Sequence, residues 1–192
     1  MAFREALSNQ LATLVVREGN FDAFYAATYP LIREYFRENI STGELTEQAA
    51  QTAALLVYTW MRPATLPVQA LSKFSVAKEA IVNARSGAIN LKDLKSIIAF
   101  VDGSVIATSK YLHFIRPDRF AIWDRRVAKA AYDLKHHYQI NDANRYLDYL
   151  SDLVEFQLPV SLALKLEELL PDQPELRRKE FALFHCGLQM TT

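Results

Sequence analysis

Apolar residues recur at steps of three and four along nearly the whole chain, and this spacing constrains the fold more than any other feature. The first example is the series Phe3, Leu7, Leu11, Leu14 and Val15. Such spacing places apolar side chains on one face of an α-helix. Asp102-Gly103 lacks the alternating apolar flanks of a β-hairpin, and no other hairpin signal occurs. The pattern predicts an all-α protein, with its helices in a compact, bundle-like orthogonal arrangement.

Start and stop signals divide this pattern into nine or ten helices. Thr46, Asn90 or Asp93, Asp124 and Asp142 are typical residues before a helix, and Asn20 can cap a helix beginning at Phe21. Pro30 should kink the second helix or divide it. The expected helices cover residues 2–18, 21–39, 46–62, 68–84, 90–101, 104–115, 124–138, 142–156, 160–170 and 175–189.

The length of 192 residues fits one compact helical domain over residues 1–192. Pro63 and Pro67 bracket a linker, which leaves an alternative division. In that alternative, an N-terminal helical layer covers residues 1–62 and a larger C-terminal part covers 68–192.

The distribution of glycine and histidine excludes several classes of site. The five glycines are scattered, so neither G-x-G-x-x-G nor a Walker-type phosphate loop exists. The four histidines, at positions 113, 136, 137 and 185, form no H-x-x-x-H or E-x-x-H pair. Helical zinc and di-iron patterns therefore fail, and we expect no metal and no cofactor.

The N-terminal residues lack the basic and apolar regions of a signal peptide, and the longest apolar run, Ala53 to Met61, is too short to span a membrane. The single cysteine, Cys186, cannot form an internal disulfide, and we expect a buried thiol. These features predict a cytoplasmic protein with no membrane partner.

The chain has 22 basic and 22 acidic side chains, but its charge is unevenly distributed. Residues 1–47 and 141–180 are net acidic, whereas residues 110–129 carry six basic and two acidic groups. Basic groups near turns and helix starts can contact phosphates, which makes this segment a candidate contact for DNA. A solvated surface that balances acidic neighbours is the alternative. The candidate nucleic-acid contacts are Arg116, Arg119, Arg125, Arg126, Lys129 and Trp123.

The same segment contains three candidate catalytic residues. Lys110 and His113 are three residues apart and share a helix face, and Asp124 begins the next expected helix. A lysine amine becomes a nucleophile when burial or a neighbouring cation removes its proton. A nearby aspartate could activate the amine or stabilise a developing positive sugar.

Each of these residues also has a structural interpretation. Asp124 is a good N-cap, Lys110 can extend from an amphipathic helix, and His113 can pack within the core. Trp123 and Phe120 can be core anchors. The tyrosines that follow could stack on bases, but their spacing fits helix faces that point to the core: Tyr132, Tyr138, Tyr146 and Tyr149.

Residues 104–131 contain, in this order, a helix, a lysine, a loop, a short apolar passage, an aspartate and a second helix. This order resembles part of the helix-hairpin-helix DNA glycosylase superfamily. The resemblance implies that Lys110 attacks the sugar carbon and that Asp124, after Phe120-Ala121-Ile122-Trp123, assists. Where the family has a glycine-rich hairpin, this chain has Ile106-Ala107-Thr108-Ser109. The segment K-x-L-H-F…P-x-x-F-x-x-W-D is also similar to helical proteins of unknown function.

Two functions follow from these features. The first is a DNA-associated, base-excising hydrolase that uses Lys110 and Asp124, and it is the interpretation with defined chemistry. The alternative is a non-enzymatic all-α interaction or regulatory module with a protein partner. Its apolar surface would come from the C-terminal side chains Phe181, Leu183, Phe184 and Leu188.

Overall fold

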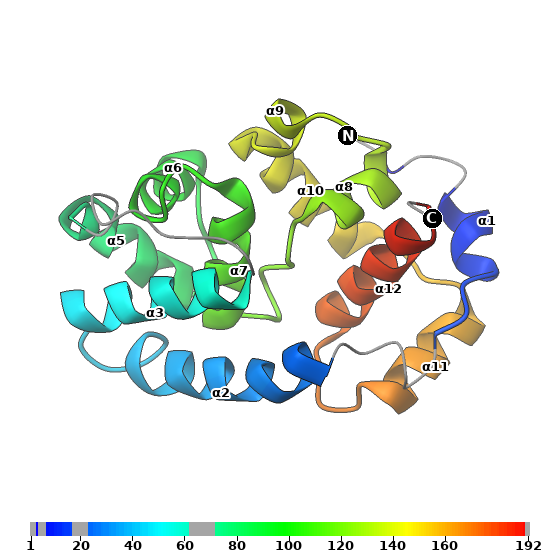
Figure 1. Cartoon of the computed structure of the whole chain (residues 1–192), viewed down its shortest axis with the longest axis horizontal. Helices are drawn as coiled ribbons and strands as arrows, with labels where there is room; N and C mark the ends of the chain where they lie inside the picture. The colour runs from blue at the N-terminus through cyan, green and yellow to red at the C-terminus, as the bar shows by residue number, and fades with distance from the viewer. Residues whose placement is uncertain (1–2, 4–6, 17–22, 62–71, 191–192) are drawn as a thin grey trace.

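The computed structural model describes residues 3, 7–16, 23–61 and 72–190. These residues form eleven helices and no strand, which confirms the all-α fold (Figure 1). The helices are α1 (Leu7–Ala12), α2 (Ala23–Asn39), α3 (Glu47–Trp60), α5 (Phe74–Arg85), α6 (Leu91–Phe100), α7 (Val105–Ile115), α8 (Arg125–Tyr132), α9 (His137–Ile140), α10 (Ala143–Glu155), α11 (Val160–Leu169) and α12 (Glu175–Gln189).

Capping side chains set four helix starts where the sequence predicts them. Thr46 accepts a hydrogen bond from Ala49 N, and Asn90 forms a capping box with Asp93. Asp124 and Asp142 each accept from two amides of the helix that follows. These caps satisfy amide groups that have no partner inside the helix, so the start signals are local.

The expected helix over 124–138 is wrong in one respect, because it is broken into α8 and α9. Asp133 ends α8 in the left-handed conformation, with φ of 54°. Aspartate enters this region more easily than most residues, and its presence gives no clear stop signal. This break accounts for a count above the expected nine or ten.

Two further expectations change near the N-terminus. The first helix ends at Ala12, and residues 13–16 leave the helix although it was expected to reach 18. Pro30 does not divide α2, which runs on to Asn39. Pro30 and Ala26, whose carbonyl loses its helical donor, are both exposed, so water can satisfy that carbonyl. The predicted Asn20 cap and the linker between Pro63 and Pro67 lie outside the described residues.

The helices pack as two groups that meet through α10 (Figure 1). In the first group, α7 contacts α2, α3, α5 and α6. In the second group, α12 packs closely on α8 and also contacts α1, α10 and α11. Helix α10 touches both α6 and α7 from the second group. Buried apolar residues of both groups form one continuous cluster.

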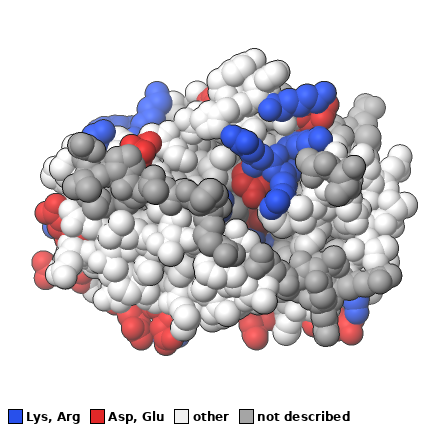
Figure 2. Space-filling model, in the orientation of Figure 1, with Lys and Arg blue, Asp and Glu red and all other residues white. Residues whose placement is uncertain are grey.

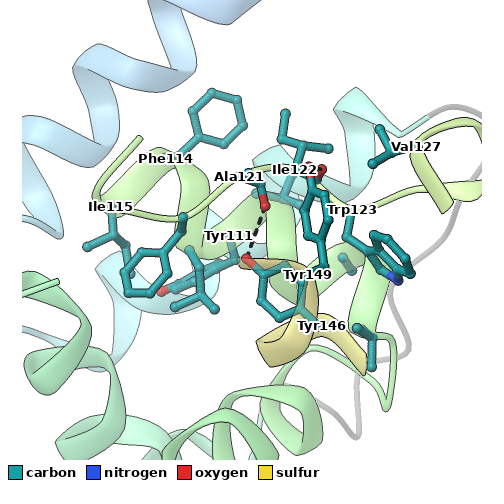
Figure 3. Packing of buried hydrophobic residues seen from close by; sticks show 14 of the residues in the cluster. Tyr111, Phe114, Ile115, Ala121, Ile122, Trp123, Val127, Tyr146 and Tyr149 are labelled. Carbon is teal, nitrogen blue, oxygen red and sulfur yellow. Dashed lines mark hydrogen bonds between the residues drawn. The ribbon is translucent and has the colours of Figure 1, made fainter. Parts of the chain in front are cut away.

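The passage between α7 and α8 is buried although it is not helical. Residues 120–123 are at most 3% exposed, and they run between rings of α7 and tyrosines of α10 (Figure 3). Buried main-chain groups need partners. Here four successive carbonyls, of residues 120 to 123, lie within hydrogen-bond distance of side-chain donors on α7 and α10. The donors are His113, Tyr146, Tyr149 and Ser109, in that order.

None of the described helices combines the length and apolar character needed to cross a membrane. Cys186 is a buried thiol, as predicted.

Candidate active site

Helix α7 is buried on almost its whole circumference. Ten of its eleven residues are buried, among them Lys110 and His113. A helix that is surrounded in this way is normally apolar all round, so two ionisable residues on it are unusual. The amphipathic surface position proposed as the alternative for Lys110 is therefore wrong, because only 9% of the residue is exposed.

The electrostatic setting of Lys110 favours loss of its proton. Burial lowers the pKa of the Lys110 amine, and the carboxylates of Asp124 and Glu180 oppose this effect. The described part of the chain gives the Lys110 ammonium neither a hydrogen bond nor an ion pair within 4 Å. A buried cation without a close partner is costly, so the neutral amine is favoured compared with an exposed lysine.

Sequence reasoning missed the two α12 residues that act on Lys110. Arg177 and Glu180 form an ion pair in which the Glu180 side chain is 2% exposed and the Arg177 side chain 16%. The Arg177 guanidinium also lies 5.3 Å from the centre of the Tyr29 ring. An i, i+3 pair of opposite charge is common on helix surfaces, so the sequence carries no sign that this pair is buried.

His113 is fully buried, and both of its ring nitrogens are hydrogen-bonded. Nδ1 is 2.9 Å from the Phe120 carbonyl and must donate to it, so neutral His113 accepts the 2.7 Å hydrogen bond from Tyr29 at Nε2. Burial lowers the pKa of His113 well below its ordinary value, and nearby Arg177 lowers it further. Neither ring nitrogen of His113 is therefore open to a substrate, which argues against the expected catalytic contact.

Asp124 reaches the site from the start of α8. Its Oδ1 accepts hydrogen bonds of 2.9 Å from both Arg126 N and Val127 N, as the N-cap interpretation predicts. The residue is half-buried, and its carboxylate influences the pKa of Lys110 as well. Capping and proximity to Lys110 therefore coexist, with capping placing the carboxylate at the site.

Close packing of α8 against α12 holds these residues together. Gly187 of α12 lies against the main-chain carbonyl of Arg126, and a methyl group at this position would overlap it. Figure 2 shows Lys and Arg side chains gathered around acidic ones at a hollow, over α8 and between α7 and α12 of Figure 1. On α8, Arg125 and Arg126 are exposed.

Two of the predicted basic contacts also have partners inside the fold. The Arg126 guanidinium lies 5.0 Å from the centre of the Phe184 ring. Lys129 Nζ donates to the Met190 carbonyl at 3.0 Å. Arg125 is therefore the α8 cation best placed to meet an anionic ligand.

Arg116 and Arg119 belong to a different region. Arg116 donates to both carboxylate oxygens of Asp118, at 2.9 and 2.6 Å, and to the Arg85 carbonyl. It lines an open hollow of about 500 Å³, together with Arg33 and Arg37 of α2. Arg119 is exposed beside Asp118. The structure thus divides the predicted basic segment between two places.

Trp123 does not belong with the nucleic-acid contacts. Its indole is fully buried and donates to the Ile140 carbonyl at 2.8 Å. Tyr149 lies beside it, with ring centres 4.8 Å apart (Figure 3). A buried indole offers no face to a base, which corrects the prediction and supports the core-anchor interpretation. Tyr146 and Tyr149 are likewise fully buried.

Comparison with known protein families, characterised proteins and solved structures finds no match to this chain. Among the described residues, no three or more His, Cys, Asp or Glu side chains are grouped to hold a metal ion. The candidate site therefore depends on the local geometry around Lys110.

Proposed function

We propose that the chain is a DNA-associated enzyme that cleaves a glycosidic bond, with the Lys110 amine as nucleophile and Asp124 as its assistant. One observation carries the proposal: Lys110 is only 9% exposed and has no close partner, and the carboxylates of Asp124 and Glu180 are near enough to act on the pKa of its amine. Amines activated by desolvation form covalent intermediates with carbon electrophiles. The proposed class of reaction is base excision.

The reaction can be written with every bond and proton accounted for. The Nζ lone pair bonds to the sugar C1′ as the bond from C1′ to the base breaks, and the base leaves with that electron pair and takes up a proton. Asp124 removes one proton from the new secondary ammonium and returns it to O4′ when the sugar ring opens. Water then hydrolyses the resulting iminium and restores the lysine. In this scheme Asp124 exchanges protons at Nζ and O4′ only.

The positive charge at the start of α8 supports DNA as the partner. Arg125 and Arg126 begin α8 directly after Asp124, so a phosphate bound there would bring a sugar close to the carboxylate. A helix N-terminus also favours anions through its free amides, although Asp124 already accepts from two of them here. The exposed guanidinium of Arg125 is therefore the proposed anion contact.

The alternative interaction module loses part of its basis. Phe181 and Leu183, which were to supply an apolar surface, are 7% and 0% exposed and pack within the core. Phe184 is half-buried beneath the Arg126 guanidinium. The C-terminal helix therefore uses these side chains for its own packing, and the enzyme remains the better supported proposal.

Reductive capture tests this function. The protein is incubated with duplexes that carry damaged bases or abasic sites, borohydride is added, and covalent complexes are separated on denaturing gels. We expect capture by the parent and a loss of at least about 100-fold in Lys110→Met. Lys179→Met, another buried lysine, is the matched control and should capture like the parent. Equal capture by Lys110→Met, or no capture across the panel, would reject the proposal.

A further inference from the structure

The open hollow beside Arg116 takes no part in the proposed reaction, although three arginines line it. Its volume is about 500 Å³, and its lining comes from α2, from the end of α7 and the loop after it, and from the loop before α12. Concave surfaces of this volume are typical of small-molecule sites. The three lining cations are Arg33, Arg37 and Arg116. Like charges around one hollow repel one another, and an anion bound between them would remove that repulsion.

Helix α2 supplies two of these cations. Arg33 and Arg37 are four residues apart, so their side chains lie on the same face of the helix, one turn from each other. Arg33 is half-buried, and no carboxylate of the described residues forms an ion pair with it. Arg37 is paired with Glu34 and Glu38, but all three side chains are well exposed. Exposed pairs of this kind are weak, so Arg37 can exchange them for a ligand.

The loop after α7 supplies the third cation in a fixed orientation. Arg116 donates to both carboxylate oxygens of Asp118 from Nε and Nη2, and to the Arg85 carbonyl from Nη1. These contacts use three of the five N–H groups of a guanidinium, so two remain for a ligand. A guanidinium that is already held loses less conformational entropy when it binds.

Two acidic residues also line the hollow, so its charge is not purely positive. Asp118 is bound by Arg116, and Asp172 is exposed, where solvent screens its charge. The lining therefore has three positive groups against two negative ones. Arg33 is the lining cation that no described carboxylate balances.

Hydrogen bonds join the elements around the hollow, so its shape exists without a ligand. The Ser41 hydroxyl, just after α2, donates to the Ile115 carbonyl at the end of α7, at 3.1 Å. The Tyr29 hydroxyl of α2 lies 3.2 Å from the Gln173 side chain in the loop before α12. Prolines stiffen both loops because their φ angles are fixed. These prolines line the hollow: Pro117, Pro171 and Pro174.

We propose that this hollow binds a small phosphomonoester, with the phosphate held by Arg33, Arg37 and Arg116 and the organic part against Pro171 and Pro174. Planar guanidinium groups match phosphate oxygens through paired hydrogen bonds. A monoester carries up to two negative charges at neutral pH, whereas each phosphodiester of a DNA backbone carries one. The monoester therefore suits three converging cations better. The inference does not depend on the proposed cleavage of a glycosidic bond.

An NMR titration of the ¹⁵N-labelled protein tests this site. The probes are AMP and ribose 5-phosphate at constant ionic strength, up to about 10 mM, which detects millimolar dissociation constants. Amide signals of residues 33–41, 114–116 and 172–173 should shift. Adenosine and ribose, which lack the phosphate, should leave these signals unchanged. The inference is wrong if neither monoester shifts them, or if the uncharged probes shift them equally.

Variants then separate the hollow from general positive charge. Arg33→Gln should weaken binding of the monoester at least about tenfold, because it removes charged hydrogen bonds. Arg33→Lys should recover part of that loss, since it keeps the charge without the planar fork. Arg119→Gln removes an exposed cation of the same loop as Arg116 that does not line the hollow, and it should bind like the parent. Equal losses in Arg33→Gln and Arg119→Gln, or no loss in either, overturn the inference.

Two further measurements keep the test decisive. If Arg33→Gln does not fold, Arg37→Gln replaces it, because the Arg37 side chain is 69% exposed and its loss should weaken binding several-fold without affecting the fold. A short DNA duplex is titrated in parallel. If the duplex shifts the signals of the hollow and the monoesters do not, the site belongs to a DNA interface and the inference is wrong. Failure of borohydride capture would reject the proposed function and leave this result unaffected.

Discussion

Two buried lysines of this protein have opposite surroundings. Lys179 Nζ forms a 2.9 Å ion pair with Glu175 and a 3.2 Å hydrogen bond with the Val154 carbonyl. Lys110 is almost as deeply buried, but its carboxylate neighbours act on it without a close ion pair. The environment of Lys179 provides partners for its charge. The environment of Lys110 disfavours the charged form. Burial alone therefore does not disfavour the charged form of a lysine, whereas burial without a close partner does.

Acid should destabilise the fold through buried histidines near Arg177, the side chain that also acts on Lys110. Burial lowers the pKa of His185 to about 4, and nearby Arg177 and Arg126 lower it further. The unfolded chain binds this proton near pH 6.5, so stability is full above pH 6.5 and is lost as pH falls toward 4. For His185 alone the loss is roughly 3 kcal/mol, and buried His113 acts in the same direction.

Urea unfolding at a series of pH values checks this expectation. His185→Phe should flatten the loss between pH 6.5 and 4, because the replacement ring does not titrate. His137→Gln changes an exposed histidine and should retain the loss. If His185→Phe has the same pH dependence as the parent, the low pKa of His185 is refuted.

Gly187→Ala should damage the Lys110 region and leave the contacts of Lys179 intact. The added methyl group meets the Arg126 carbonyl, which is main chain, so α8 must move away from α12. Overpacking of this kind lowers the free energy of unfolding by about 1–3 kcal/mol. Chemical denaturation measures the loss, and Ala182→Gly on the same helix provides a control without added volume. A stability equal to that of the parent would show that α8 and α12 are not in close contact.

Replacing each lysine by methionine should change stability in opposite directions. Lys179→Met removes an ion pair and a hydrogen bond, so the free energy of unfolding should fall by about 1 kcal/mol. Lys110→Met removes a disfavoured charge and should raise it by a similar amount at pH 7. The lowered pKa of Lys110 means that parent stability rises with pH as far as the unfolded value near 10.5. Lys110→Met should lack that rise in urea titrations between pH 7 and 10, and a loss of stability in Lys110→Met would contradict the comparison.

Arg125→Ala should have the smallest effect, limited to nucleic-acid binding at the start of α8. One lost phosphate contact should weaken binding a few-fold and reduce the slope of log affinity against log salt by about 1. Fluorescence anisotropy at several salt concentrations measures both quantities. Lys135→Ala removes an exposed cation of the loop after α8 and serves as the control. Equal salt slopes for Arg125→Ala and the parent would remove Arg125 from the proposed interface.

Local signals explain why most of the fold could be predicted from the sequence. The caps at Thr46, Asn90 and Asp142 act on amides two or three residues away, so each helix start is encoded where it occurs. The break at Asp133 could not be predicted in the same way. Its left-handed conformation allows the chain to leave α8 and begin α9, and no glycine marks the position.

The candidate site could be predicted only in part, because half of it depends on tertiary contacts. Lys110 and Asp124 lie on either side of one loop, and their residue types and their order along the chain suggested a shared site. Glu180 is 70 residues beyond Lys110, and its burial depends on how α12 packs against α8. Trp123 and His113 were assigned to substrate because their side chains suit such contacts. The fold uses both to secure the main chain instead.

The buried passage over residues 120–123 fixes the distance between the two proposed reactive groups, Lys110 and Asp124. Side chains from α7 and α10 hold four successive carbonyls of this passage. Contacts with those two helices, and not the length of the loop, therefore determine where Asp124 lies. The exposed turn at Asp118 and Arg119 precedes this buried passage. Added length at that turn would leave the position of Asp124 relative to Lys110 unchanged. Removing one residue from 120–123 would move the remaining carbonyls out of register with their side-chain donors on α7 and α10. Asp124 would then move away from Lys110.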